Sequence, residues 1–252
     1  MAPRVSYTIW FSQRTGSSLL TNALGETGVA GHPEEWLETW GGPELLDRYG
    51  VSDGTGLLAK LRELGTTENG VWGAKVSFHE PRHSEAIELL REGLGVGDGA
   101  TRAEVWEAAF PNHHHIFMTR RNKVRLAVSW WRAIKSGRWH RRAGTGTVGH
   151  RPERDGVEDY DFDAIARLVT ESVMREAGIA AFLSEAGIVP MTLVYEDFIL
   201  DYEGTVRGVL DLLGVEADVP PPALLPTADA VSEAWVQRFR AEAQAGWGYR
   251  GW

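Results

Sequence analysis

The chain has 252 residues, a formal net charge of −9 and no cysteine, which excludes disulfides, thiolate metal sites and thiol nucleophiles. The acidic balance argues against broad binding to nucleic acid or to an anionic membrane surface. No apolar run reaches the roughly 20 residues that a membrane span needs, and the first residues lack the pattern of a signal peptide. We therefore expect a cytoplasmic protein without membrane insertion or a nucleic-acid partner.

Strand and helix patterns alternate along the chain. The predicted strands are 7–11, 70–78, 115–120 and 191–198, and the predicted helices begin at Ser17 and cover 81–94, 122–137, 161–187 and 232–244. This alternation predicts an α/β fold of the P-loop type, in which helices flank a parallel sheet. Because chains of this length can share one core, residues 1–252 are predicted to form a single domain.

Capping and loop signals mark the ends of these elements. Asp161 or Asp163 can cap the long helix, and Gly187 can end it in a left-handed conformation. The glycine-rich segment 138–159 has no apolar periodicity, so we predict a long, mobile loop there. The proline-rich segment 219–226 predicts a stiff, extended connector before the last helix.

The stretch from Tyr7 to Leu20 predicts an anion site. An apolar strand ending at Phe11 leads through Ser-Gln-Arg-Thr-Gly-Ser-Ser into a helix, so backbone N–H groups and the positive helix end meet at the turn. Arg14 adds charged donors, and Gly16 lets the backbone approach an anion closely. The ATP-binding motif G-x-x-x-x-G-K-[ST] is not matched, because its first Gly and its Lys are missing. A phosphate group is the expected occupant, and a turn without a ligand is the alternative.

A second cationic segment follows the predicted strand 115–120. Arg121 follows that strand, and Ser129 lies eight residues later across a helical segment. Since ligands bind beyond the carboxyl ends of parallel strands, these two side chains are candidates for a further phosphate. The alternative is a solvated basic helix face.

Three other patterns leave alternatives open. His113 to His115 are consecutive strand residues that point to opposite faces, so a metal site formed by all three is geometrically poor. Lys75 and Ser77 share one face of a strand, where they either approach a ligand or belong to an ordinary strand. The eleven tryptophans either anchor the core and surface or include an aromatic acceptor pocket.

Six segments in order carry a family resemblance: "SQRTGSSLL", "TGVAGHPEEW", "NGVWGAKV", "RNKVRLAVSWWRAIKSGRWH", "YDFDAIARLV" and "ADAVSEAWVQRFRAE". Together they span most of the chain and resemble the PAPS-dependent sulfotransferases, specifically the actinobacterial branch related to trehalose 2-sulfotransferase. The resemblance implies the sulfotransferase fold. It also implies transfer of a sulfuryl group from PAPS to a hydroxyl group, which gives a sulfate ester and PAP.

The resemblance further implies roles for the cofactor-binding residues. Arg14 would neutralise charge on the bridging oxygen and on the transferred sulfuryl group in place of the missing Lys, and no metal is expected. Arg121 and Ser129 match the family's pair for the 3′-phosphate of PAPS. The residues implied to bind the 5′-phosphosulfate are Gln13, Arg14, Thr15, Gly16, Ser17 and Ser18.

On the acceptor side, Glu35 matches the position of the family's catalytic carboxylate, with its neighbour Glu34 as the alternative. The trehalose enzyme carries an acidic residue where this chain has His32, which argues against trehalose as the acceptor. His32 either assists proton transfer or is an ordinary surface histidine. The expected acceptor-binding residues are His32, Trp36, Trp40 and Trp139, which suit a flatter hydroxylated molecule such as a natural product.

Two other classes of function compete with sulfuryl transfer to a small hydroxylated molecule. The first is an ATP-dependent phosphotransferase on a similar sheet, which would require magnesium. The second is a non-catalytic module that binds a nucleotide or a glycan. Pairing of two chains into a homodimer stays open.

Overall fold

The computed structural model describes residues 2–37, 42–142, 146–149 and 159–248. Its elements, in chain order, are β1 (Val5–Phe11), α1 (Ser17–Glu26), α2 (Gly42–Tyr49), α3 (Gly54–Gly65), β2 (Val71–Ser77), α4 (Arg82–Leu94), α5 (Arg102–Ala109), β3 (His113–Thr119), α6 (Lys123–Ser136), β4 (Arg138–Arg142), β5 (Gly146–Gly149), α7 (Phe162–Glu185), β6 (Met191–Val194), α8 (Tyr195–Phe198), α9 (Tyr202–Leu213), β7 (Leu224–Leu225) and α10 (Ala230–Ala243).

The chain divides into two compact units, and each is described by itself. The first unit comprises Met1–Thr119 and Arg175–Pro221, and the second comprises Arg120–Met174 and Pro222–Trp252. The helix α7 contributes residues to both. The single domain expected from chain length stays a prediction. Within the described residues, no helix is both long and apolar enough to cross a bilayer.

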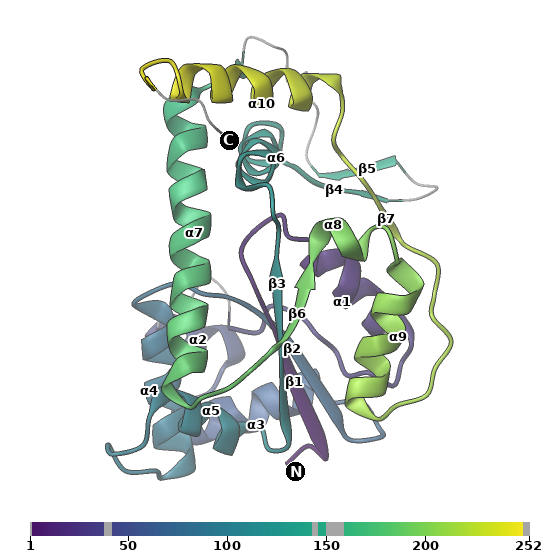
Figure 1. Cartoon of the computed structure of the whole chain (residues 1–252). Coiled ribbons are helices and arrows are strands. Elements are labelled where there is room, and N and C mark those ends of the chain that lie inside the picture. Colours follow the sequence, from purple (N-terminus) through teal and green to yellow (C-terminus); the bar gives the residue numbers. More distant parts are fainter. Residues whose placement is uncertain (1, 38–41, 143–145, 150–158, 249–252) are drawn as a thin grey trace. The chain divides into compact units, whose positions relative to one another are not determined.

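A four-stranded parallel sheet forms the centre of the first unit. Its strand order is β2-β1-β3-β6, and every neighbouring pair is parallel (Figure 1). The register pairs Phe11 at the end of β1 with Ser77 on β2 and with Met118 on β3. The carboxyl ends of these strands therefore meet at one edge, and the loop that follows Phe11 begins there. The predicted parallel sheet flanked by helices is confirmed.

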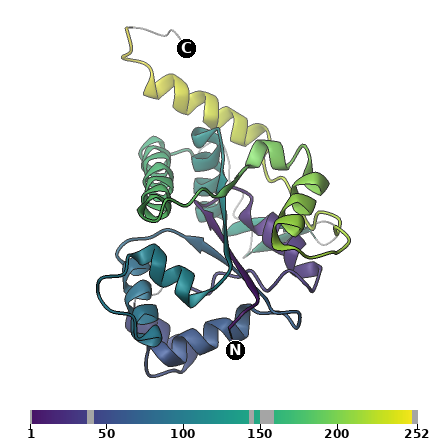
Figure 2. The same cartoon turned by 60° about the horizontal axis from the view of Figure 1, so that its bottom comes forward.

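Alternating side chains of the strands build a core on each face of this sheet. Tyr7, Ile9 and Phe11 pack with residues of α1 and α9 on one face. Trp10 and Trp72 belong to the cluster on the other face, which is covered by α2 to α5 and the last turns of α7. Figures 1 and 2 show these two helical layers on opposite sides of the strands.

The second unit has its own apolar core and a small sheet. The core joins α6, α10 and the first half of α7, and its residues are Leu126, Ala127, Val128, Trp130, Ile165, Leu168, Trp235, Val236 and Phe239. The sheet has the order β5-β4-β7 and is antiparallel. The carboxylate of Asp229 caps α10 by accepting from the N–H of Ser232 at 2.9 Å, and it also pairs with Arg132.

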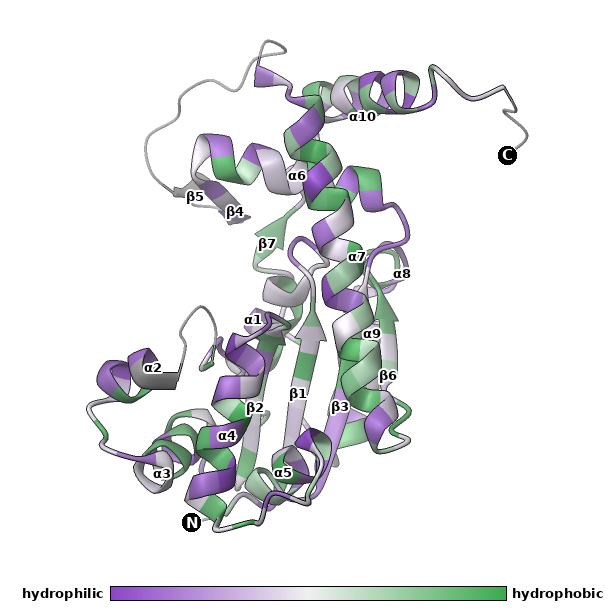
Figure 3. Cartoon of the chain, turned by 90° about the vertical axis from the view of Figure 1, so that its left-hand side faces the viewer, coloured by the Kyte–Doolittle hydropathy of each residue, from purple (hydrophilic) through white to green (hydrophobic). Residues whose placement is uncertain are grey.

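Along α4 and α10, green and purple bands alternate in Figure 3, as expected for amphipathic helices.

Two sequence-based predictions need correction. The segment 191–198 is only half strand, because the pairing of β6 with β3 ends at Val194. Residues Tyr195–Phe198 have no ladder to join and form the helical turn α8. The segment 138–159 was predicted to be a loop, yet β4 and β5 form a hairpin within it. Its backbone groups are paired with each other and with β7, far along the chain. Residues 143–145 and 150–158 lie outside the described residues.

Other boundaries follow the predicted chemistry. Asp161 caps α7, since its Oδ1 accepts from the N–H of Ala164 at 2.9 Å. Gly187 follows the helix with φ of 64°, as predicted for a left-handed C-terminal residue. The connector 219–226 is irregular apart from the short strand β7.

Candidate active site

The loop between β1 and α1 has the backbone of an anion-binding turn. Gly16 caps α1 with φ of 88° and carries no side chain that could accept from the first N–H groups of the helix. Arg14 also has a positive φ, 66°, which is uncommon for a residue other than glycine. The buried Thr15 donates its hydroxyl to the carbonyl of Ser12 at 2.8 Å and fixes the turn. The start of α1 thus offers N–H groups and a positive dipole end to an anion.

Gly16 is required by space as well as by conformation. A Cβ at this position would lie 2.9 Å from Cδ2 of Tyr195, whereas Gly28, with φ of 69°, has open space around it. We expect Gly28→Ala to lower the free energy of unfolding by about 1 kcal/mol through the left-handed backbone alone. Gly16→Ala should lower it by about 1 kcal/mol more, because the Tyr195 ring must move. Chemical denaturation measures both, and equal losses would contradict the close contact.

A buried arginine braces the loop from α7. Arg175, only 7% exposed, donates through Nη1 to Ser77 Oγ at 2.6 Å and to Oε1 of Gln13. Gln13 in turn donates through Nε2 to Ser77 Oγ at 3.1 Å. The guanidinium is therefore compensated by polar oxygens of the loop and of β2, and its charge lies beside the anion-binding turn.

A carboxylate on the next residue of α7 ties together the ends of two strands. Oε1 of Glu176 accepts from the hydroxyl of Ser12 at 3.0 Å, and Oε2 accepts from the hydroxyl of Thr119 at 3.0 Å. Ser12 follows β1 and Thr119 ends β3. Glu176 consequently fixes the beginning of the loop to the sheet edge.

The segment before α2 places a second carboxylate at the same edge. Glu34 forms a parallel bridge with Ala74, and its carbonyl accepts from the N–H of Lys75 at 3.0 Å. The side chain of Glu35 pairs with the ammonium of Lys75, which also donates to Ser18 Oγ at 3.2 Å. Lys75 is 7% exposed. One buried cation therefore joins Glu35 to the first turn of α1.

The predicted acceptor residues of the first unit differ in their surroundings. Glu34 points to solvent, whereas the Glu35 side chain is 28% exposed and contacts Lys75. The His32 side chain is exposed. The indole N–H of Trp36 donates to the carbonyls of His32 and Gly73, at 3.0 and 3.1 Å. Trp36 thus anchors the segment that carries Glu35 to β2.

The remaining predicted site residues lie elsewhere. Arg121 is exposed just before α6, and Ser129 is half-buried within that helix. Trp139 lies on β4 and is 39% exposed. These three belong to the second unit, whereas the loop between β1 and α1 belongs to the first. Trp40 lies outside the described residues.

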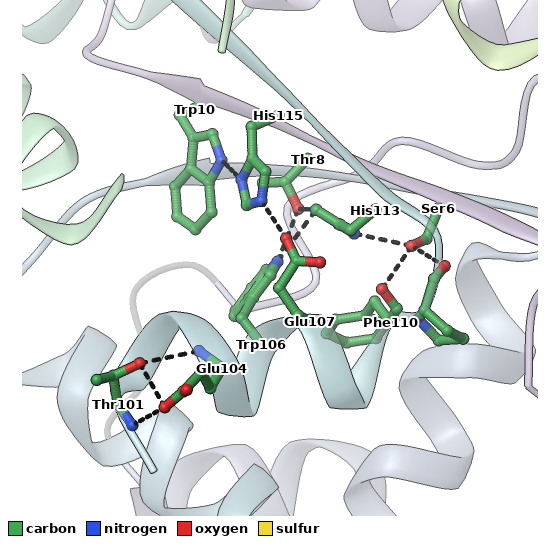
Figure 4. Close-up of polar contacts among 11 residues, drawn as sticks. Ser6, Thr8, Trp10, Thr101, Glu104, Trp106, Glu107, Phe110, His113 and His115 are labelled. Carbon is green, nitrogen blue, oxygen red and sulfur yellow. Dashed lines mark hydrogen bonds and ion pairs between the residues drawn. The ribbon is translucent and has the colours of Figure 1, made fainter. Parts of the chain in front are cut away.

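The histidine run forms a buried polar network, shown in Figure 4. Trp10 Nε1 donates to His115 Nδ1 at 2.9 Å, so the other ring nitrogen carries the proton and donates to Glu107 Oε1 at 2.8 Å. Trp106 Nε1 donates to His113 Nε2 at 3.2 Å, so Nδ1 of His113 donates to Ser6 Oγ at 2.8 Å. Burial lowers the pKa of both histidines. Both rings are therefore neutral structural groups.

Sequence reasoning missed Arg175 and Glu176, and it left Lys75 as an open alternative. A signal for Arg175 exists, because it shares a helix face with Ile179, Phe182 and Leu183, all buried. A charged residue on an apolar helix face needs a partner. Glu176 offers no such signal, since an isolated Glu on a helix looks like a solvated residue.

The sequence is similar to sulfotransferases over most of its length. The family model described as Stf0 sulphotransferase matches residues 6–242. A trehalose 2-sulfotransferase of Mycobacterium tuberculosis is 30% identical over 265 residues, covering 94% of this chain and 95% of the relative. A trehalose 2-sulfotransferase of Mycolicibacterium smegmatis is 30% identical over 266 residues, covering 95% of this chain and 96% of the relative.

Two solved structures also match over most of their length. A sulfotransferase from Alicyclobacillus acidocaldarius is 16% identical with a TM-score of 0.46, covering 96% of this chain and 95% of that one. The sulfotransferase domain of the Synechococcus PCC 7002 olefin synthase is 16% identical with a TM-score of 0.45, covering 95% and 88%. Because the family model spans nearly the whole sequence, this chain belongs to the Stf0 sulphotransferase family and is a sulfotransferase.

Proposed function

We propose that the enzyme transfers the sulfuryl group of PAPS to a hydroxyl group of a small molecule, giving a sulfate ester and PAP. The observation that carries this proposal is the ion pair of Glu35 with Lys75 at the edge of the loop that begins α1. Lys75 thereby links Glu35, the carboxylate that would accept the hydroxyl proton, to Ser18 in the first turn of α1.

The residues of the loop fit a phosphosulfate group. The turn offers the N–H groups of Ser17 and Ser18, the hydroxyls of both residues, and the positive end of α1. Arg14 on the turn and Lys75 beside it supply positive charge. A group with two adjacent anionic centres is stabilised by this combination of directed N–H donors and cations.

When bound, PAPS supplies an activated sulfuryl group attached to a phosphate leaving group. The chain's own residues would orient this group, offset charge that develops on the leaving oxygen, and accept the proton of the attacking hydroxyl. Arg14 fits the charge-offsetting role and Glu35 the role of base. Gln13, braced by Arg175 and Ser77, fits a role in positioning the loop.

We further propose that Arg121 and Ser129 bind the 3′-phosphate of PAPS. Arg121 lies just before α6, the helix that follows β3 along the chain, and Ser129 lies in the middle of that helix. Asn122 caps this helix by accepting from the N–H of Arg125 at 3.0 Å. An arginine beside a helix N-terminus, together with a hydroxyl on the same helix, matches the chemistry of a phosphate site.

The names of the curated relatives support a sugar hydroxyl as the acceptor. The imidazole of His32, in place of an acidic side chain, weakens the case for trehalose itself. Trp36 and Trp139 have ring surface that suits a sugar or a flatter hydroxylated molecule. We therefore propose a hydroxylated small molecule and include trehalose among the acceptors to be tested.

Calorimetric titration of the purified protein without magnesium tests the donor. We expect tight binding of PAP and at least about tenfold weaker binding of 5′-ADP and ATP, a difference of about 1.4 kcal/mol or more. The three nucleotides differ in where their phosphates lie, so selectivity reports on a separate 3′-phosphate site. Mass spectrometry of mixtures with PAPS and an acceptor panel then detects the sulfate ester. Preference for ATP with a magnesium requirement would favour a phosphotransferase instead.

A further inference from the structure

Lys75 differs from every other residue of its strand in carrying a charge. It lies near the carboxyl end of β2, and all seven residues of this strand are buried. A buried ammonium loses hydration, and this loss is offset only when the charge is paired and hydrogen-bonded. The carboxylate of Glu35 and the hydroxyl of Ser18 at 3.2 Å supply this compensation. The ring of Phe11 adds a third contact, with its centroid 5.5 Å from the ammonium.

The partners of Lys75 are themselves parts of the proposed site. Ser18 belongs to the first turn of α1, where the N–H groups at the helix start are proposed to bind an anion. The Glu35 side chain is 28% exposed, so it retains access to solvent although it is paired with the lysine. A purely structural ion pair on this strand could be replaced by apolar side chains at little cost. The pairing instead joins the two groups that must act on donor and acceptor.

We propose that Lys75 is a second catalytic cation, shared between Glu35 and the phosphosulfate of the donor. The proposal rests on the function proposed above and adds a residue to it. Because an anion at the start of α1 and the Glu35 carboxylate both attract the same ammonium, they compete for it. Donor binding therefore draws Lys75 toward Ser18 and weakens its hold on Glu35, which leaves the carboxylate available to the acceptor hydroxyl.

The transfer step balances with these groups. The acceptor oxygen forms a bond to sulfur while the bond from sulfur to the bridging oxygen breaks, and that bond's electron pair stays on the phosphate oxygen. The hydroxyl proton passes to Glu35. Lys75 keeps its protons throughout and offsets the negative charge on the leaving oxygen, in concert with Arg14.

Competition for one ammonium predicts opposite effects of two substitutions on PAP affinity. Lys75→Met removes a charge-assisted contact and should weaken PAP binding by about 10-fold to 100-fold. Glu35→Gln removes the competitor and should tighten PAP binding by roughly 3-fold to 10-fold. In the double variant the gain in PAP affinity from Glu35→Gln should largely disappear, because the Lys75 ammonium for which Glu35 and PAP compete is no longer present.

The matched control is Lys60→Met, which removes the same charge and breaks a surface pair with Glu63 on α3. This variant should bind PAP like the wild type. Lys75→Arg keeps the cation and should retain PAP affinity within about 3-fold, although the wider guanidinium lowers turnover. Circular dichroism and thermal unfolding check that each variant folds. If Lys75→Met does not fold, the sign of the Glu35→Gln effect and the affinity of Lys75→Arg still decide the question.

The outcomes separate this inference from the proposed function. If the wild type transfers sulfuryl groups and binds PAP, but Lys75→Met binds PAP equally well, then Lys75 does not contact the donor and the inference is wrong. If Glu35→Gln and Lys75→Met both weaken PAP binding, the pair is structural, and the inference is also wrong. If the wild type itself neither prefers PAP nor forms a sulfate ester, the proposed function fails first.

Discussion

Replacing Glu35 with glutamine is expected to lower kcat for sulfuryl transfer by about 10²-fold to 10⁴-fold, the usual contribution of a positioned general base. The amide is nearly the same size as the carboxylate but cannot accept the hydroxyl proton. Its carbonyl oxygen still accepts a hydrogen bond from Lys75, so the segment that carries it keeps its place along β2. Affinity for PAP should therefore not weaken. Steady-state rates with PAPS and calorimetry with PAP measure the two quantities separately.

Glu34→Gln is the matched control for this experiment. It makes the same chemical change one residue earlier, on a side chain that points to solvent. The bridge of Glu34 to β2 uses only main-chain atoms and survives the substitution. We expect kcat within about 2-fold of the wild type, because a surface substitution of this kind has little effect. Equal loss of activity in both variants, or loss of PAP affinity together with kcat in Glu35→Gln, would show that Glu35 has only a structural role.

Acidification is expected to destabilise the first unit through His83. Its imidazole is 6% exposed among the rings of Trp10, Phe78, Trp106 and Phe182. Neither ring nitrogen has a hydrogen-bond partner among the described residues. Burial, with a smaller contribution from the charge of Arg102, lowers the pKa of His83 from 6.5 to about 3. The folded protein therefore keeps this ring neutral where the unfolded chain would protonate it.

The sign of the pH effect follows from proton binding. Between pH 6.5 and about 3 the unfolded chain binds a proton at this histidine and the folded chain does not, so stability falls as the pH falls through that window. From pH 7 to 4.5 the loss at His83 alone amounts to about 2 to 3 kcal/mol. Burial lowers the pKa values of His113 and His115 as well, so both act in the same direction.

Urea unfolding at pH 7 and at pH 4.5 measures this effect, and His83→Phe isolates it. Phenylalanine keeps an aromatic ring in the cluster and removes the titrating group. The variant should lose about 2 to 3 kcal/mol less than the wild type on acidification. Parallel curves for His83→Phe and the wild type would contradict the assignment.

Local sequence patterns were enough to predict the parts of the fold that depend on near neighbours. The strand, turn and helix around Phe11 to Ser17 were predicted because apolar alternation, Gly16 and the helix start are all local signals. The cap at Asp161 and the left-handed Gly187 follow from the same kind of chemistry. The hairpin formed by β4 and β5 was not predicted, because its strands are short and β4 pairs with residues 224–225, more than 80 positions away.

The candidate site was predictable only where charge and turn chemistry coincide along the chain. Arg14 stands out by its place in the turn, and Glu35 was implied only by the family resemblance, but the groups that support them come from other elements. Lys75 lies on β2 and Arg175 on α7, and only the folded arrangement brings them to the loop. Helical periodicity places Arg175 on an apolar face, yet it cannot say that Gln13 and Ser77 will accept its hydrogen bonds.

At Arg14, the left-handed backbone conformation of the loop is unfavourable for the side chain that the proposed chemistry needs. Glycine adopts a φ of 66° without strain, whereas arginine does so at a cost of about 1 kcal/mol. The loop therefore carries a side chain that its own backbone disfavours, and its positive charge lies next to the positive end of the α1 dipole, which is also unfavourable until an anion binds. With the charge-offsetting role proposed for Arg14, selection for thermal stability alone would favour glycine at this position and lower turnover. A laboratory evolution experiment on this protein should therefore measure turnover as well as stability from the first round of selection.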